Sequence, residues 1–398
     1  MSCIALRVLS MLLVLLAQSR SLADAAKVAE GRLDGAPAPA RRPVEDPVCL
    51  GWQDGSWFVH RYEASKGNWT SWPSPPSALP KKAFHAVGAH AVAVLDPWQQ
   101  YSGWLFDLHT QRWTPIPVSP IAGPTNHVDP ITVAFLEGRL LVWGLTKGPP
   151  HGAALDTEAM RWKQIADAPI NLRVRALARA AGDKLYVWSG FGPGSPLNNG
   201  GFGPQNDGAV YDATRDQWKR LPEPKAQIGL YGQAAALRGD RFIVFGGRAP
   251  GGQRPMGAVV RSGIIFDPAD VSWDLIPDSP FDIAIMPACA AAGDELFIWS
   301  GQSAAAEVAG ASKLCTEAAV YNFVTRKWER LPEAPLKPRS LSFTKGSGRT
   351  VTVWGGWDSS ANPAKFHRDA ATFDLEKRVW QRIPDLPGDV PYALHPGW

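Results

Sequence analysis

The sequence predicts an all-β fold built from repeated four-stranded units, and two observations carry this prediction. First, a tryptophan recurs at intervals of 44, 49, 56, 55, 55 and 52 residues, each time six residues after a carboxylate or its amide. Second, apolar segments ending in glycine or serine precede several of these pairs. Self-similarity at a period of about 50 residues is typical of stacked supersecondary units. The recurring tryptophans are Trp69, Trp113, Trp162, Trp218, Trp273, Trp328 and Trp380.

One well-formed unit shows why four strands are expected. Residues 234–237 are small and apolar, as suits an innermost strand near a crowded axis, and residues 238–240 (Arg-Gly-Asp) predict a hairpin turn. Residues 242–245 predict the next strand, which Gly246 and Gly247 end. A third strand is expected at 263–266 and an outer fourth strand at 273–276, stopped by proline. Gly355 and Gly356 repeat the paired glycine in a later unit.

The paired glycine, the aromatic-acidic pair and the spaced tryptophan together resemble the kelch repeat over residues 47–398. The resemblance implies a β-propeller, with blades of four antiparallel strands around a central channel. Complete units at 83–117, 128–167, 174–222, 232–277, 286–332 and 340–384 make six. The N-terminal stretch supplies three further strands and the segment around Tyr392 a lone first strand. We therefore expect a composite seventh blade that closes the ring, the alternative being six blades with the N-terminal segment packed outside.

The first residues have the pattern of an export signal. Arg7 precedes an apolar run, and Ala23 and Ala25 stand where signal peptidase requires small residues. Residues 26–46 are rich in alanine, proline and charge, which predicts a flexible leader. The expected mature protein is exported, periplasmic or extracellular, and not inserted in the membrane after cleavage of residues 1–25.

Charge and cysteine content exclude two classes. The formal net charge is only +4, and no run of five Lys or Arg occurs, which argues against a nucleic-acid partner. Cys49, Cys289 and Cys315 are too few for a disulfide framework. Cys289 and Cys315 fall in one repeat, and the sequence is compatible either with a disulfide bridge between them or with two buried thiols.

Repeated residues are expected to be structural. A tryptophan at one fixed place in every unit predicts packing between blades, and so do Trp143, Trp188, Trp299 and Trp354 at one strand position. The aspartates of the repeated pairs predict turns in which a carboxylate accepts backbone N–H groups. Trp98, Trp357 and Trp398 lie outside the pattern and are the tryptophans left for a ligand.

Function is expected on the face that carries the second-to-third-strand loops, which are long and unlike one another, whereas the opposite turns are short. Kelch repeats often carry Arg, His or Tyr near the start of first strands. A ring of such side chains predicts a site for an anionic or hydroxyl-rich ligand. The rim candidates are Lys82, His85, His127, Arg173, Arg175, Tyr231, Arg339, Trp357 and Tyr392.

Three candidate functions differ in the residues that each requires. A copper radical oxidase of the galactose oxidase type shares the expected fold but needs tyrosines and a cysteine together near the axis, and no cysteine accompanies Tyr101, Tyr231 or Tyr392. A sialic-acid mutarotase or epimerase, an exported kelch propeller, needs only an acid or base and an anion-holding arginine. The leading hypothesis is a non-catalytic propeller that binds a protein or glycan partner.

No metal or cofactor is expected. Hydrolase, phosphate-loop and paired-cysteine zinc signatures are absent from the sequence. The nearest metal-like pairs are His127 with Asp129 and His367 with Asp369, and each is expected to be ordinary loop polarity.

Overall fold

The computed structural model describes residues 43–123, 131–149, 151–226, 229–249, 258–304, 313–358 and 365–388. The chain divides into two compact units, residues 1–43 and 44–398, and only the second is described below. The expected signal at 1–25 lies outside the described residues, so export stays a prediction. The second unit begins before the expected boundary at 47, and the N–H of Val44 already donates to the carbonyl of Ala89 (2.8 Å). No described helix is long and apolar enough to cross a bilayer.

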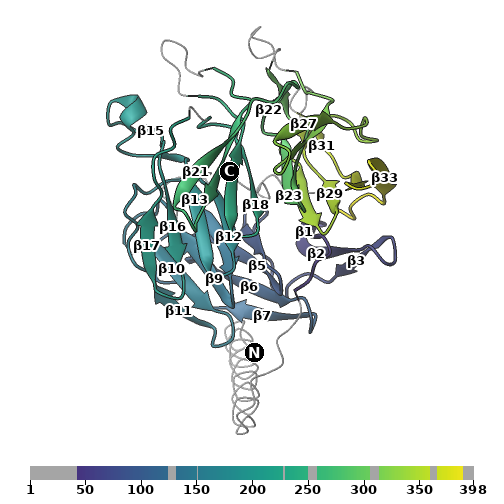
Figure 1. The fold of residues 1–398 in the computed structure, drawn as a ribbon. Coiled ribbons are helices and arrows are strands. Elements are labelled where there is room, and N and C mark those ends of the chain that lie inside the picture. The colour runs from purple at the N-terminus through teal and green to yellow at the C-terminus, as the bar shows by residue number, and fades with distance from the viewer. Residues whose placement is uncertain are drawn as a thin grey trace, which may run out of the picture. The chain divides into compact units, whose positions relative to one another are not determined.

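Six antiparallel four-stranded sheets follow one another along the described chain, and we number them blades 1 to 6 (Figure 1). Blade 1 contains β4 (Phe84–Val87), β5 (Ala91–Asp96), β6 (Ser102–Asp107) and β7 (Arg112–Ile116). Blade 2 contains β8 (Thr132–Leu136), β9 (Arg139–Trp143), β10 (Gly152–Asp156) and β11 (Arg161–Gln164). Blade 3 contains β12 (Leu177–Ala181), β13 (Lys184–Trp188), β16 (Gly208–Asp212) and β17 (Gln217–Arg220).

The next three blades keep the same order of strands from the channel outward. Blade 4 contains β18 (Ala234–Arg238), β19 (Arg241–Phe245), β20 (Gly263–Asp267) and β21 (Ser272–Ile276). Blade 5 contains β23 (Ala288–Ala292), β24 (Glu295–Trp299), β26 (Ala318–Asn322) and β27 (Lys327–Arg330). Blade 6 contains β28 (Phe343–Ser347), β29 (Thr350–Trp354), β32 (Ala370–Asp374) and β33 (Val379–Ile383).

The middle strands of each blade are apolar because neighbouring blades cover both of their faces. In β19 and β24, four of the five residues are buried. The inner strands of blades 3, 4 and 5 are instead rich in alanine, as in β23 (Ala-Cys-Ala-Ala-Ala), and these strands approach one another around the channel. This arrangement matches the expectation from the sequence that residues 234–237 form an innermost strand.

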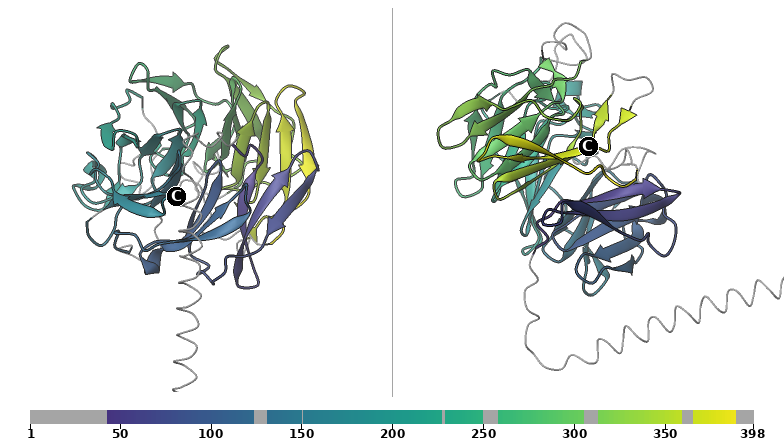
Figure 2. Two further views of the ribbon diagram at one scale, coloured as in Figure 1. Left: turned by 90° about the horizontal axis from the view of Figure 1, so that it is seen from below. Right: turned by 90° about the vertical axis from the view of Figure 1, so that its right-hand side faces the viewer.

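The seventh blade begins with β1 (Val48–Gln53), β2 (Ser56–Glu63) and β3 (Asn68–Trp72), which form a three-stranded sheet beside blade 6 (Figure 2). The ammonium group of Lys345 on β28 donates to the carbonyls of Val44 and Asp46 (3.0 Å each). The chain also returns to β1, since a Cβ placed on Gly388 would lie 3.7 Å from the carbonyl oxygen of Trp52. The expected seven-bladed ring is confirmed, and the six-bladed alternative is wrong. The expected inner strand around Tyr392 lies outside the described residues.

The recurring tryptophans join each blade to its predecessor, as expected. Every one of the seven donates its indole N–H to a backbone carbonyl that follows the outer strand of the preceding blade, at 2.7–2.9 Å. The bond from Trp69 to Pro384 runs from the seventh blade to blade 6 and so closes the ring. The second-strand tryptophans pack in the same interfaces, as Trp188 does edge-on against Trp273 (ring centroids 5.2 Å apart).

The substitution Trp69→Phe tests this closure. It keeps an aromatic ring in the interface but removes the N–H donor, and we expect it to lower the free energy of unfolding by about 1 kcal/mol, the usual net value of one hydrogen bond. Urea unfolding followed by fluorescence measures the change. Trp98→Phe, at a side chain that is 44% exposed, is the control. Equal effects of the two substitutions would contradict a role for the Trp69 bond.

The aspartates of the repeated pairs hold turns, as expected. Asp107, for example, accepts the backbone N–H groups of His109 (2.8 Å) and Thr110 (2.7 Å) through one carboxylate oxygen. The same arrangement recurs at Asp156, Asp212, Asn322 and Asp374, with Asp267 accepting one such N–H group. These carboxylates are therefore part of the scaffold.

The long loops carry small hairpins on one face, on the upper side of Figure 1, where β15, β22 and β31 are labelled. We call it the long-loop face. In each hairpin, one side consists of residues that follow the second strand of a blade. The other side is either a later part of the same loop or the segment just before a first strand. Two single turns of 3-10 helix, η1 (Pro97–Gln99) and η2 (Pro196–Asn198), also lie in second-to-third-strand loops. The hairpins are β14 (Phe191–Gly192) with β15 (Gly203–Pro204), β22 (Ile283–Ile285) with β25 (Gln302–Ser303), and β30 (Trp357–Asp358) with β31 (Lys365–Phe366).

The three cysteines of the described chain are buried free thiols. Cys289 and Cys315 belong to one hydrophobic cluster between blades 4 and 5 without forming a bridge. Of the two arrangements left open by the sequence, the structure has the pair of buried thiols.

Candidate functional site

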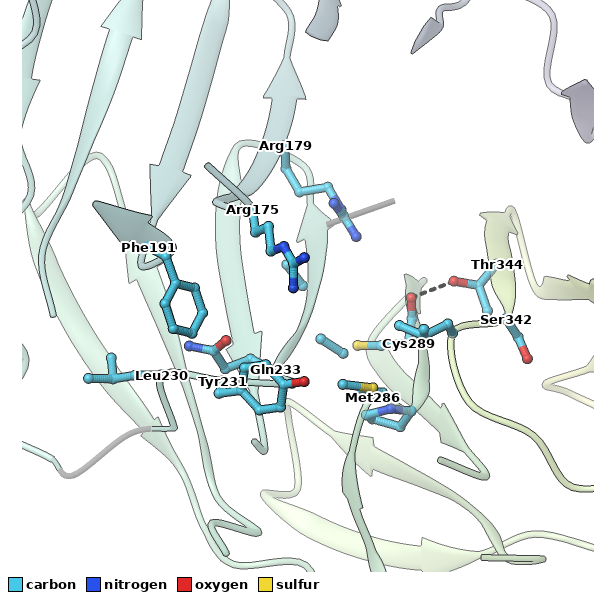
Figure 3. A pocket seen from close by; sticks show the side chains of 15 residues that line it. Arg175, Arg179, Phe191, Leu230, Tyr231, Gln233, Met286, Cys289, Ser342 and Thr344 are labelled. Carbon is cyan, nitrogen blue, oxygen red and sulfur yellow. Dashed lines mark hydrogen bonds between the residues drawn. The ribbon is translucent and has the colours of Figure 1, made fainter. Parts of the chain in front are cut away.

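A cavity opens where the inner strands of blades 3 to 6 begin, next to the long-loop face. Its interior has room for the centres of water-sized spheres in only about 50 Å³, and the volume is about 630 Å³ when the space open to solvent at its mouth is included. Figure 3 shows Arg175 and Arg179 from blade 3, Tyr231 and Gln233 from blade 4, and Met286 from blade 5 around it. We call it the channel-mouth cavity.

One residue in each of these four blades enters the cavity from the same repeat position, just before the first strand. These residues have left-handed backbones, with φ values of 55° at Arg175, 69° at Gly232, 52° at Met286 and 58° at Leu341. The residue before each one pairs with the residues that follow the second strand, as Val174 does with Phe191. Positive φ is uncommon for residues other than glycine, and such backbones cluster at functional sites. The repeat therefore builds a row of positions whose side chains set the chemistry of the cavity.

Arg179 places a positive charge inside the channel. It lies on β12, and its Nη1 donates to the carbonyl of Ala178 (2.8 Å). The side chain is half-buried because the channel is open to water, but protein surrounds it, and this burial lowers the pKa of its guanidinium. No Asp or Glu is present among the described residues that line the cavity. A buried charge is costly without a counter-charge, so Arg179 can receive an anion.

Uncharged groups fill the rest of the wall. Tyr231 packs edge-on against Phe191, with ring centroids 6.1 Å apart. Gln233 is fixed by its amide N–H, which donates to the carbonyl of Gly229 (2.5 Å). Burial raises the pKa of the Cys289 thiol to about 12, outweighing the opposite effect of Arg179, so this sulfur is a neutral thiol at pH 7. The cavity thus combines cations with neutral hydrogen-bonding groups.

Arg173 and Arg339 do not point into the cavity, contrary to their assignment to the rim. Both side chains are 0% exposed. Arg339 binds both carboxylate oxygens of Asp369 (2.6 and 2.9 Å) and donates to the carbonyls of Gly355 and Lys337. Arg173 binds one carboxylate oxygen of Asp207 (2.8 Å) and donates to the backbone carbonyls of Asp207 and of two nearby residues. Both guanidinium groups are committed to the scaffold because a buried charge must be paired.

The second glycine of the repeated pair makes room for this arginine. A Cβ at Gly356 would lie 2.7 Å from Cδ of Arg339, and its φ is 101°. The stem of Arg339 therefore packs directly on the glycine backbone. Gly247 has the same left-handed backbone (φ 89°), where a Cβ would meet the carbonyl oxygen of Tyr231 at 2.7 Å.

Of the rim candidates, the structure brings together Arg175 and Tyr231. Lys82 is exposed on blade 1, and His85 on β4 stacks on Trp57 of the seventh blade, with centroids 6.4 Å apart. Trp357 is half-buried in the hairpin of β30. Ligand binding by these residues stays a prediction. His127 and Tyr392 lie outside the described residues.

The metal-like pair of His367 and Asp369 is part of the scaffold. Burial and the nearby charge of Arg339 lower the pKa of His367 to about 4. Burial alone would raise the pKa of Asp369, but its bonds to Arg339 bring it below the usual value. Within the described segments, no group of three or more His, Cys, Asp or Glu could hold a metal ion. The other pair, His127 with Asp129, lies outside those segments.

Sequence reasoning missed Arg179, Gln233, Met286 and Leu341. A signal for two of them was present: Met286 and Leu341 align with Arg175 in the repeat, two residues after the Arg173-type position. Arg179 is the charged residue in a first strand that otherwise reads Leu-Ala-Ala-Ala. Such a charge is only a candidate for the channel wall, because Arg238 on the inner strand β18 pairs with Asp294 instead.

Comparison with known proteins adds to this geometry. No protein-family model matches the chain. A kelch domain-containing protein of Vibrio cholerae is 35% identical over 117 residues, which are 29% of this chain and 32% of that protein. The chain is a kelch-repeat β-propeller.

Other relatives of this kelch propeller carry the name of an enzyme. N-acetylneuraminate epimerases from two strains of Haemophilus influenzae are 24% and 28% identical over 290 residues, 72% of this chain. The match spans 66% of the length of these epimerases, just under two thirds. Among solved structures, YjhT matches 79% of the kelch propeller and 99% of its own chain, with a TM-score of 0.55 and 14% identity. That likeness is one of fold.

Proposed function

We propose that this kelch propeller binds a small acidic sugar in the channel-mouth cavity. The observation that carries the proposal is Arg179, whose guanidinium faces a cavity in which the described lining offers it a backbone carbonyl but no carboxylate. Guanidinium groups bind carboxylates through two parallel hydrogen bonds, which makes a carboxylated ligand the natural counter-charge. Tyr231 and Gln233 add neutral groups of the kind that bind sugar hydroxyls.

The relatives support this class of ligand. Two of them are named for N-acetylneuraminate, an acidic sugar. The proposal narrows the partner expected from the sequence, a protein or a glycan, to a carboxylated saccharide. A protein partner on the long-loop face stays a prediction.

The substitution Arg179→Leu tests the proposal. We expect it to weaken binding of N-acetylneuraminate by about 10- to 100-fold, since a hydrogen bond to a charged group contributes about 1.5–3 kcal/mol. Isothermal titration calorimetry with the full chain measures the affinity. Arg179→Lys keeps the positive charge but lacks the planar guanidinium group, so it should retain part of the affinity.

Arg112→Gln, on the exposed outer strand β7, is the matched control and should bind like the wild type. If Arg179→Leu also binds like the wild type, the site lies elsewhere. No binding by the wild type at millimolar sugar overturns the proposal.

Anomer exchange or epimerisation of the bound sugar is a second candidate, favoured by the names of the two relatives. Exchange of anomers removes a proton from the anomeric hydroxyl and delivers one to the ring oxygen, so it needs positioned acid and base groups. NMR of N-acetylneuraminate with and without the protein detects it. An unchanged exchange rate leaves binding alone as the function.

A further inference from the structure

The walls of the channel-mouth cavity differ in chemistry around the ring. Blade 3 supplies the two guanidinium groups of Arg175 and Arg179. Blade 5 supplies Met286, and blade 6 supplies Leu341 together with the hydroxyl residues Ser342 and Thr344. We call Met286 and Leu341 the apolar wall. The inner strands of blades 3, 4, 5 and 6 neighbour one another in that order. Blade 4 therefore separates the two guanidinium groups from the apolar wall.

The apolar wall is fixed by both packing and backbone bonds. Met286 is 6% exposed and forms a cluster with Ala284 and Ile285, against which Tyr231 and Leu341 pack. The N–H of Leu341 donates to the carbonyl of Met286 (3.1 Å), and the N–H of Met286 donates to the carbonyl of Gly232 (2.6 Å). These two hydrogen bonds link the left-handed positions of blades 4, 5 and 6 to one another and so fix the orientation of the Met286 and Leu341 side chains.

The position between the two walls has no side chain. Gly232 occupies the left-handed position of blade 4, and a Cβ there would lie 2.7 Å from Cγ2 of Ile285 and 3.4 Å from Cγ of Met286. Any larger residue would press on the side chains of Ile285 and Met286. Glycine at this position therefore lets blade 4 pack closely against the base of the apolar wall.

We propose that the cavity selects an anion that also carries an apolar acyl or alkyl group, with the anion at Arg175 and Arg179 and the apolar group against Met286 and Leu341. This inference rests on the proposed binding of an acidic sugar. It adds that the apolar wall, rather than the carboxylate alone, decides which acidic sugar binds. Apolar contact discriminates because water is removed from both surfaces on binding.

Two sugars that share a carboxylate and a ring provide the test: N-acetylneuraminate and its deaminated counterpart, which has a hydroxyl in place of the acetamido group. Calorimetric titration of the wild type should give about tenfold tighter binding of the acylated sugar, the usual effect of a small apolar group in a hydrophobic pocket. Met286→Gln keeps the length of the side chain but makes it polar, and Leu341→Asn introduces a residue that tolerates the left-handed backbone. Combined, the two substitutions should make the affinities for the two sugars nearly equal.

Met286→Leu is the matched control, because a volume-conserving apolar exchange should keep the preference. Thermal unfolding of each variant shows that it is folded. If the wild type binds both sugars equally, or the polar variants keep the preference, this inference is overturned while the proposed function stands. If the wild type binds neither sugar, the proposed function fails and this inference fails with it.

Discussion

Arg339→Ala is expected to lower the free energy of unfolding by about 3–5 kcal/mol, the usual result of removing one partner of a buried ion pair. The guanidinium is 0% exposed and binds both oxygens of Asp369, which is itself only 14% exposed. Its loss leaves the carboxylate buried without a counter-charge and opens a space beside Gly356. Chemical unfolding followed by circular dichroism measures the change.

Arg326→Ala is the control for this prediction. Arg326 pairs with Asp274, and the two side chains are 55% and 62% exposed, so its removal should cost less than about 1 kcal/mol. The double substitution Arg339→Met with Asp369→Leu should recover much of the lost stability, because a buried ion pair can be replaced by apolar residues of similar volume. If the Arg339→Ala variant were as stable as the wild type but had lost sugar binding, Arg339 would be a ligand-binding residue and not part of the scaffold.

Acid is expected to destabilise the propeller between about pH 6.5 and pH 4. His60 on β2 is 2% exposed, and burial together with the charge of Arg368 lowers its pKa to about 4. The unfolded chain, with a histidine pKa of about 6.5, binds the proton first, so stability falls as the pH drops through this window and levels off below it. The expected loss for His60 is about 2 kcal/mol between pH 7.5 and pH 5.

The position of His60 explains why protonation is unfavourable. Its Nδ1 lies 2.8 Å from Oγ of Ser71, and its Nε2 has no hydrogen-bond partner in the described structure. The imidazole packs on the backbone of Gly51, where a Cβ would lie 2.4 Å from Nε2 and 3.2 Å from the carbonyl oxygen of Pro387. His367 adds to the effect in the same direction, because burial and the charge of Arg339 lower its pKa to about 4 although Asp369 and Asp358 oppose the shift.

Urea unfolding at a series of pH values tests this prediction. His60→Gln should flatten the pH dependence of the free energy of unfolding by the amount that His60 contributes, whatever its effect at neutral pH. His109→Gln, at an exposed turn, should leave the pH dependence in place. An unchanged pH dependence in His60→Gln would show that other groups cause the loss.

The repeat determined most of the fold. Spacing of the tryptophans predicted the bounds of blades 1 to 6, and the paired glycines helped to place the strands of the best-formed unit. Each unit repeats the same local pattern, a turn after an aromatic-acidic pair and a tryptophan that is buried between blades. The expected closure followed from counting strands at the two ends. The hydrogen bond from Trp69 to Pro384, which joins the seventh blade to blade 6, confirms this closure of the ring.

The site was only partly predictable, as the arginines show. Arg173 and Arg175 are two residues apart, yet the first is buried against Asp207 and the second enters the cavity. The left-handed backbone at Arg175 redirects the chain, so an alternating pattern cannot tell which side chain faces the channel. Arg339 looked like a rim residue because the sequence does not show that Asp369, 30 residues later, neutralises it.

By itself, the sequence determined the class of fold and predicted the six complete units and the face that carries the long loops, because these follow from local patterns repeated along the chain. The choice of seven blades over six needed the contact between the chain ends, as in the bond from Trp69 to Pro384. Only the tertiary structure decided which side chains meet. Arg179, Tyr231, Met286 and Leu341 come from four different blades, and the closing of the ring brings them to one cavity. Contacts between blades depend on the geometry of the whole ring, which no single repeat encodes.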